Sequence, residues 1–355
     1  MTSIYLYDTS AYLYAGDAIS KPSDDVLRES LHGLPINGIR YVLRRVLSKK
    51  AELNAYVYCA MDSYTNKKDL YDGYKAQRTK NQNVFFQREL LKFVLPKLGI
   101  PMLIKNGYEA DDLVYTFVQE LVLNNKLVDQ KLTIFSDDFD LAGAVMNQSI
   151  SKYGIRSDNQ EVLTPLNYES LFYAKGKKIP YNMALPYILC FGKPSNNVSR
   201  LSTASPEAVF RSIQDYLFGN YVNDNQDLSN YFSSVYMLDL WFKHSKSIKE
   251  FSDEVYNEIE LRIPVVYPNL KATDYIDVGK LDKEFAINFL TLINETSLLN
   301  YLGIDNTIIR HDLRDNILNK FLMVYRQGIY HVDNFTTPDS SFFFEDADSM
   351  NVGGF

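Results

Sequence analysis

The sequence has few of the features that mark secreted, membrane-bound or zinc-binding proteins. It contains two cysteines, Cys59 and Cys190, and both lie in apolar runs, so we expect two buried free thiols. No apolar run reaches the roughly 18 residues that a membrane span needs. The four histidines are scattered, without the spacing or the cysteine partners of a zinc site. They are His32, His244, His311 and His331.

The chain also lacks an excess of positive charge. Its net charge of -7 and its sequence pI of about 5.3 argue against a protein that coats DNA non-specifically. They do not exclude an enzyme whose own site is rich in carboxylates. The segment 1–5 leads directly into a strand pattern with no basic stretch before it, which argues against a signal peptide. We therefore expect a cytoplasmic protein.

Strand-like and helix-like segments alternate over the first 140 of the 355 residues. This alternation predicts an α/β fold, with a parallel sheet and flanking helices. The expected strands are Ser3–Tyr7, Ala55–Met61, Pro101–Ile104 and Leu132–Phe135. The expected helices are Leu34–Leu53, Phe85–Leu98 and Asp111–Leu123, while Thr9 and Ser10 are expected to form a turn.

The pattern becomes mainly helical after about residue 158, which suggests a second region. We expect domains at 1–160 and 161–335, and an acidic, aromatic tail at 336–355. The predicted helices of the second region are Tyr168–Tyr173, Tyr181–Cys190, Ser205–Leu217, Leu228–His244, Phe285–Leu302 and Leu313–Tyr325.

Carboxylates stand where the predicted strands end. Asp8, Asp62 and Asp138 each follow a strand closely, and the carboxyl ends of parallel strands meet at one edge of a sheet, where ligands bind. Three independent strands therefore deliver acidic side chains to the same edge.

Two acidic clusters extend this pattern. Glu109 and Asp112 are three residues apart at the start of a helix, on one face, with Asp111 beside them. Asp138 and Asp140 point the same way if the chain stays extended, which leaves Asp137 pointing elsewhere and not a ligand. Taken singly, each cluster has an ordinary alternative, an acidic helix start or an Asp-rich turn. Together they predict a site for Mg²⁺ or Mn²⁺, which prefer oxygen ligands.

A polar, cationic segment lies between the second strand and the next helix. It contains Tyr74, Lys75 and Arg78, and Lys67 and Lys68 precede it. Cations near a carboxylate site can bind substrate phosphates, and an aromatic ring can stack on a base. A solvated surface loop is the alternative for this segment taken alone.

In this order the motifs resemble those of the 5′-nucleases, which include the flap endonucleases, the 5′-nuclease domain of bacterial DNA polymerase I and phage 5′→3′ exonuclease or ribonuclease H enzymes. The resemblance covers roughly residues 1–200. It implies a PIN-like fold with a helical arch at about 63–90. It also implies that Lys75 and Arg78 contact the scissile phosphate. The metal-site carboxylates that it implies are Asp8, Asp62, Glu109, Asp111, Asp112, Asp138 and Asp140.

The implied activity is metal-dependent hydrolysis of DNA or RNA–DNA at a 5′ end, flap or nick, as in primer removal during replication. Asp138, Lys75 and Arg78 would be catalytic, and Tyr74 would help to bind the substrate. If the chain is phage-encoded, as the resemblance suggests, its location would be the host cell cytoplasm.

One departure from the family pattern concerns a second metal ion. The family shows Gly-Asp-x-x-Asp-Asn, whereas this chain has Gly192, Lys193 and Asn196 at the corresponding places. Lys193 would then place an ammonium group where a cation sits and meet substrate phosphate. A catalytically impaired fold that binds DNA junctions or a replisome protein is the alternative. A third reading is a ribonuclease of the simple PIN type, acting on single-stranded RNA, which is less favoured because this chain is longer than that simple domain needs.

The tail carries three adjacent aromatic residues, Phe342, Phe343 and Phe344, among acidic ones. Such a segment can dock in a hydrophobic pocket of a partner, for example a sliding clamp. Folding back on its own domain is the alternative.

Overall fold

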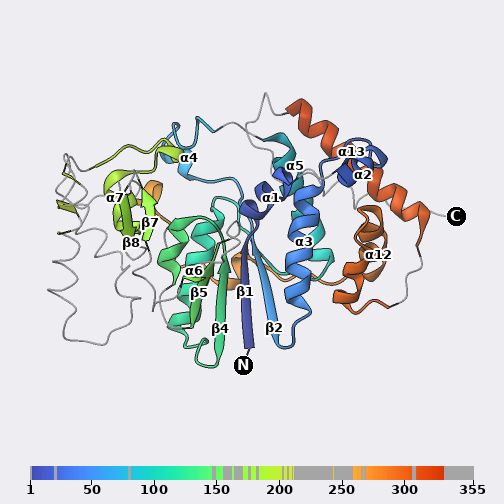
Figure 1. Ribbon diagram of the computed structural model, residues 1–355, viewed down its shortest axis with the longest axis horizontal. Helices are drawn as coiled ribbons and strands as arrows, with labels where there is room; N and C mark the ends of the chain where they lie inside the picture. Colours follow the sequence, from blue (N-terminus) through green and yellow to red (C-terminus); the bar gives the residue numbers. More distant parts are fainter. Residues whose placement is uncertain are drawn as a thin grey trace. The chain divides into compact units, whose positions relative to one another are not determined.

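The computed structural model describes two compact units, and each is assembled from stretches that are far apart in the sequence (Figure 1). The first unit combines Met1–Leu6, Thr65–Thr79 and Lys105–Asp274. The second combines Tyr7–Tyr64, Lys80–Ile104 and Tyr275–Phe355. The structure describes residues 2–19, 22–78, 81–145, 149–154, 162–163, 171–174, 177–180, 184–201, 204–205, 208–209, 211, 243, 259–264, 267, 269–305 and 309–331.

The sheet of the first unit has the strand order β6-β5-β4-β1. Its central pair is parallel, with Leu132 of β4 (Gln130–Phe135) opposite Ile150 of β5 (Ile150–Tyr153). The short β6 (Val162–Leu163) joins β5 in antiparallel orientation. β1 (Thr2–Asp8) begins in this unit. In β4, Leu132 and Ile134 are buried and alternate with less buried residues, as expected of a strand packed on one face.

Helices and turns of the first unit carry the functional side chains. The 14-residue helix α6 (Ala110–Leu123) begins directly after Glu109 and buries an apolar face that includes Leu113, Val114 and Phe117. Figure 1 shows α6, β4 and β5 in the same part of the molecule. The other elements are α4 (Lys67–Leu70), η1 (Phe139–Ala144), the antiparallel pair β7 (Leu171–Ala174) and β8 (Lys177–Pro180), α7 (Ala184–Phe191) and η4 (Pro194–Asn196).

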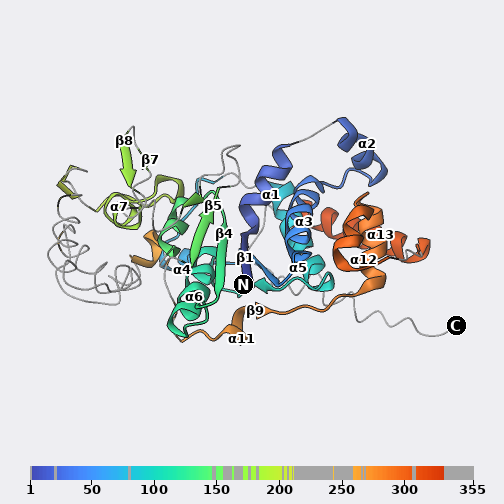
Figure 2. The same ribbon diagram turned by 60° about the horizontal axis from the view of Figure 1, so that its bottom comes forward.

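The second unit has its own short run of strands, in the order β2-β3-β9. β2 (Ala55–Ala60) and β3 (Met102–Leu103) are parallel, and β9 (Ile276–Asp277) is antiparallel to β3. Figure 2 shows α3, α5, α12 and α13 gathered together in this unit. Its helices are α1 (Thr9–Ala18), α2 (Pro22–Ser30), α3 (Asn37–Lys50), α5 (Gln82–Lys97), α12 (Lys283–Leu292), η6 (Thr296–Leu302) and α13 (His311–His331), and α11 (Ala272–Tyr275) leads into it.

The expected α/β fold is confirmed, with a mixed sheet that is mainly parallel and flanked by helices. The buried free thiols of Cys59 and Cys190 are also confirmed. Among the described residues, no helix combines the length and the apolar character that crossing a membrane requires. The cytoplasmic location stays a prediction.

Three local expectations were wrong. Thr9 and Ser10 begin helix α1 instead of forming a turn, because the Asp8 side chain accepts a hydrogen bond from Ala11 N and caps the helix. The described part of 168–173 belongs to strand β7, since a short apolar run does not distinguish a strand from a helix. The expected helix 285–302 is divided into α12 and η6, and Asn294 lies at the break with a φ of 57°.

Most of the expected helices 228–244 and 205–217 lies outside the described residues, as does the whole tail 336–355. The docking of that tail on a sliding clamp therefore stays a prediction.

Candidate active site

The first unit gathers five of the seven predicted carboxylates into two neighbouring groups. One is the Glu109–Asp112 pair at the start of α6. The other, the aspartate group, consists of Asp111, Asp138 and Asp140, which can each offer an oxygen within 4.8 Å of the others. The adjacent residues Asp111 and Asp112 serve different groups because each helical step rotates the side-chain direction by about 100°.

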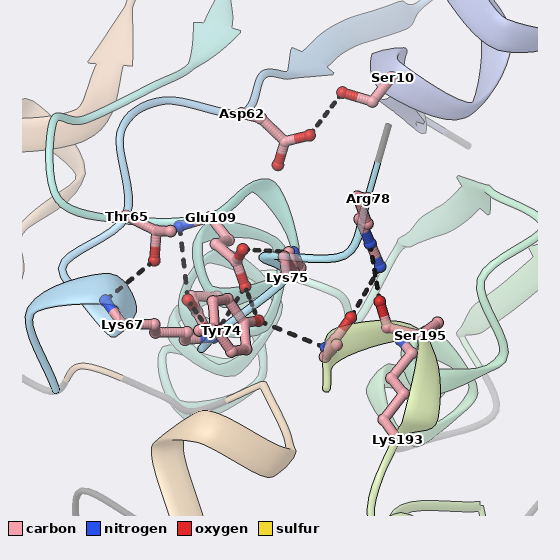
Figure 3. Close-up of polar contacts among 12 residues, drawn as sticks. Ser10, Asp62, Thr65, Lys67, Tyr74, Lys75, Arg78, Glu109, Lys193 and Ser195 are labelled. Atoms are coloured by element: carbon pink, nitrogen blue, oxygen red, sulfur yellow. Dashed lines mark hydrogen bonds and ion pairs between the residues drawn. The ribbon is translucent and has the colours of Figure 1, made fainter. Parts of the chain in front are cut away.

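A buried lysine, Lys67, holds the Glu109–Asp112 pair together, and Figure 3 shows it with Glu109. The Lys67 ammonium group lies 3.1 Å from Glu109 Oε2 and 2.9 Å from Asp112 Oδ2, and the side chain is 5% exposed. Tyr74 donates its hydroxyl to Glu109 Oε2 at 2.8 Å, and Lys75 forms an ion pair with Glu109 Oε1. Protein donors thus already satisfy both oxygens of Glu109.

These contacts keep the groups of the pair charged. Burial by itself would lower the pKa of Lys67, but Asp112 and Glu109 raise it well above its usual value. Burial would raise the pKa of Glu109, but Lys67 and Lys75 hold it well below its usual value. Lys67 and Glu109 are therefore a buried ion pair, which is costly to break by removing one partner.

A tightly bonded turn after β4 positions the aspartate group. Asp138 caps η1 by accepting a hydrogen bond from Asp140 N at 3.1 Å, and Ser136 Oγ accepts one from Asp138 N at 3.0 Å. From outside the turn, Lys152 Nζ donates to Ser136 O and Tyr115 Oη donates to Asp140 O, both at 2.7 Å. The two carboxylates are therefore fixed by the strand end and by its neighbours.

Lys193 reaches the aspartate group from the other side. Its ammonium group lies 3.2 Å from Asp138 Oδ2 and forms an ion pair with Asp140 Oδ2. Burial and the nearby Asp138 carboxylate raise the pKa of Asp140. For Asp138 burial acts in the same direction, but Lys193 and the hydrogen bond from Asp140 N outweigh it and lower the pKa.

One oxygen of this group has no hydrogen-bond partner. Asp140 Oδ1 is buried, and among the described residues no donor reaches it. An unsatisfied anionic oxygen in the interior is costly, and a hard divalent cation is the ligand that its chemistry suits. The residues present therefore fit a Mg²⁺ or Mn²⁺ ion at Asp111, Asp138 and Asp140.

The turn that carries Lys193 is bonded to the cationic segment. Arg78 donates to Ser195 O at 3.0 Å and to Asn196 Oδ1 at 2.7 Å, and Lys75 N donates to Asn196 O at 2.9 Å. Lys75 and Lys193 thus pair directly with carboxylates, and Arg78 is bonded to the turn that carries Lys193. Their placement beside an acidic site is what binding of a phosphate oxygen and a metal ion together would require.

Asp8 and Asp62 belong to the second unit. The Asp8 side chain caps α1, and Asp62 Oδ2 accepts a hydrogen bond from Ser10 Oγ at 2.6 Å (Figure 3). Ser10 is a partner that the sequence did not indicate. Whether Asp8 and Asp62 join the other five carboxylates stays a prediction.

Two further residues differ from their expected surroundings. Tyr74 is 2% exposed, so stacking on a base would require its ring to leave the interior. Lys67 is the residue that sequence reasoning missed, because nothing in the sequence distinguishes it from the exposed Lys68.

Asp137 is exposed, and it is not part of the aspartate group.

The hydroxyl of Tyr74 leads to a first prediction. Changing Tyr74→Phe removes its hydrogen bond to the buried Glu109 carboxylate, and we expect a loss of about 1.5–3 kcal/mol in the free energy of unfolding. Urea denaturation followed by circular dichroism measures it. Tyr56→Phe, at a tyrosine that is 58% exposed, is the control. Equal unfolding midpoints for the two variants would contradict the stabilising role of this hydrogen bond.

Part of the chain matches a known protein family. Residues 3–170 match the family model described as the 5′-3′ exonuclease N-terminal resolvase-like domain. The segment 3–170 is that of the 5′-nuclease family. The matched segment contains all seven predicted carboxylates together with Lys75 and Arg78, whereas Lys193 lies beyond it.

Curated members of the 5′-nuclease family are similar over much of the chain. A 5′-3′ exonuclease of Aquifex aeolicus is 27% identical over 220 residues, which is 61% of this chain and 70% of the relative. A 5′-3′ exonuclease of Mycoplasma genitalium is 26% identical over 213 residues, or 56% and 70%. The crystal structure of the T5 D15 protein with metal ions covers 91% of this chain and 99% of its own, at 10% identity and a TM-score of 0.42.

Proposed function

We propose that this protein is a 5′-nuclease that uses a divalent metal ion to hydrolyse phosphodiester bonds of DNA or RNA–DNA at a 5′ end, flap or nick. The observation that carries the proposal is the aspartate group, in which no described residue donates to the buried Asp140 Oδ1, while Lys193 pairs with the group and Lys75 pairs with Glu109. A carboxylate site for a hard cation beside phosphate-binding cations is the combination that phosphodiester hydrolysis needs.

The roles of the side chains follow from their present partners. Asp111, Asp138 and Asp140 would hold Mg²⁺ or Mn²⁺, which when bound lowers the pKa of a water molecule and neutralises charge on the leaving oxygen. Lys75 and Arg78 would exchange Glu109 and Asn196 for oxygens of the scissile phosphate and so stabilise its charge in the transition state.

The other four carboxylates complete the proposal. Asp8 and Asp62 are proposed as further metal ligands, on the strength of their places at strand ends and within the family-matched segment. Glu109 and Asp112 are proposed with them, and Glu109 Oε1 becomes available when Lys75 moves to the substrate. A role in replication, such as primer removal, would follow from action on RNA–DNA ends.

The alternative is a catalytically impaired member of the family that binds DNA junctions or a replisome protein. Lys193, at a place where the family pattern has an aspartate, is the observation in its favour. The five gathered carboxylates weigh against it, because binding a polyanion does not call for a cluster of negative charge.

Metal removal distinguishes the two functions. We expect the protein to cleave a 5′-labelled flap, a nicked duplex or an RNA–DNA hybrid when Mg²⁺ or Mn²⁺ is present. We also expect EDTA to abolish cleavage and added Mg²⁺ to restore it. Product sizes on denaturing gels are the measurement. Binding of these substrates without cleavage under every metal condition would support the alternative instead.

A further inference from the structure

The ammonium group of Lys193 occupies a position that suits a cation. It contacts Asp138 Oδ2 at 3.2 Å and Asp138 Oδ1 at 3.4 Å, and it also forms an ion pair with Asp140 Oδ2. The side chain is 13% exposed, so solvent screens these contacts only weakly. One lysine thus bridges both carboxylates of the turn after β4.

The backbone around Lys193 is built to hold it there. Gly192 has a φ of +69°, and a Cβ atom at this position would lie 2.3 Å from Val198 O, so only glycine fits. The turn that follows ends at Asn197, which has a φ of 60°. Arg78 fastens this turn through Ser195 O and the Asn196 side chain. A freely moving surface lysine would have none of these constraints.

Lys193 supplies positive charge where a second divalent ion would need negative charge. Its ammonium group pairs with both Asp138 and Asp140. A second divalent ion on these two carboxylates would therefore lie beside a positive charge in a partly buried site, which is unfavourable.

We propose that Lys193 is the second cation of this site. Its ammonium group takes the place of a second metal ion on Asp138 and Asp140, and the aspartate group binds a single divalent ion through the oxygens that Lys193 leaves available, Asp140 Oδ1 among them. The inference rests on the proposed metal-dependent function and specifies how many ions this part of the site binds.

Counting bound Mn²⁺ without substrate tests the inference separately from activity. Electron paramagnetic resonance titration gives the number of ions per chain for the wild-type protein, Lys193→Asp, Lys193→Met and the exposed-site control Lys126→Asp. We expect Lys193→Asp to bind one more ion than the wild type, and Lys126→Asp to bind the same number as the wild type. The extra ion should disappear when Asp138→Asn is added to Lys193→Asp.

The uncharged variant Lys193→Met supplies a second measurement in case Lys193→Asp does not fold. Removing the ammonium charge without adding a ligand should tighten Mn²⁺ binding by about tenfold or more, because two close positive charges repel each other strongly at a partly buried site. Circular dichroism confirms that each variant is folded.

Several outcomes separate this inference from the proposed function. Equal Mn²⁺ counts in the wild type and a folded Lys193→Asp variant would overturn the inference, even if the wild type cleaves its substrates. Unchanged Mn²⁺ affinity in a folded Lys193→Met variant would overturn it as well. Absence of metal-dependent cleavage, together with an extra ion in Lys193→Asp, would overturn the proposed function and leave the role of Lys193 standing.

Discussion

Replacing Asp138 by alanine is expected to lower metal-dependent cleavage by at least about 100-fold, which corresponds to about 2.7 kcal/mol of transition-state stabilisation. Asp138 contributes an oxygen to the aspartate group, pairs with Lys193 and caps η1. The change therefore removes a proposed metal ligand and a partner of the nearby cation. Initial rates on the best cleaved substrate, over a range of Mg²⁺ concentrations, are the measurement.

The adjacent residue provides a matched control for this experiment. Asp137→Ala makes the same chemical change one position away, at an exposed side chain outside the aspartate group. We expect this variant to cleave at nearly the wild-type rate. Similar rates for Asp138→Ala and Asp137→Ala would remove Asp138 from the proposed metal site. A large loss in both variants would show instead that the turn as a whole is sensitive to substitution.

Lys67→Met is expected to lower the free energy of unfolding by about 3–5 kcal/mol, the usual cost of leaving a buried charge without its partner. Glu109 and Asp112 are both buried, and Lys67 bridges them. Methionine fills similar space but leaves two carboxylates facing each other with less compensation. Urea denaturation of the full chain, followed by circular dichroism, measures the change.

Two further variants identify the cause of that loss. Lys68→Met removes the same charge from the exposed neighbouring residue and should leave the unfolding midpoint almost unchanged. Adding Asp112→Asn to Lys67→Met should recover part of the lost stability, because one of the uncompensated charges disappears. A Lys67→Met midpoint equal to that of Lys68→Met would mean that the buried ion pairs contribute no net stability.

The sequence predicted the parts of the site that depend on local geometry. Asp138 and Asp140 follow a buried strand, and Glu109 and Asp112 lie at the start of a helix. Their spacing and their places at the ends of predicted elements were therefore sufficient to identify them as candidates. The separation of Asp111 from Asp112 also follows from helical geometry, although it requires knowing which neighbour each side chain meets. Strand β4 and helix α6 were predicted because both carry strong apolar patterns.

Contacts between distant parts of the chain were not predictable in the same way. Lys67 is buried only because α4 lies against the start of α6, where Asn66 N donates to Gly107 O at 3.1 Å. Lysine is usually a surface residue, and the local sequence gives no sign that this one is buried. The bond between Arg78 and Asn196 likewise joins residues 118 positions apart, and no local pattern links them.

That separation has a consequence for how the protein acquires its site. The segment 65–79 is made early, whereas the turn that fastens Arg78 and supplies Lys193 comes more than 100 residues later. Closing so long a loop costs chain entropy before its contacts contribute, which slows folding. During synthesis the nascent chain therefore carries its acidic groups before it has the lysine that neutralises Asp138 and Asp140. The first unit completes its cation arrangement only once residue 196 has emerged from the ribosome.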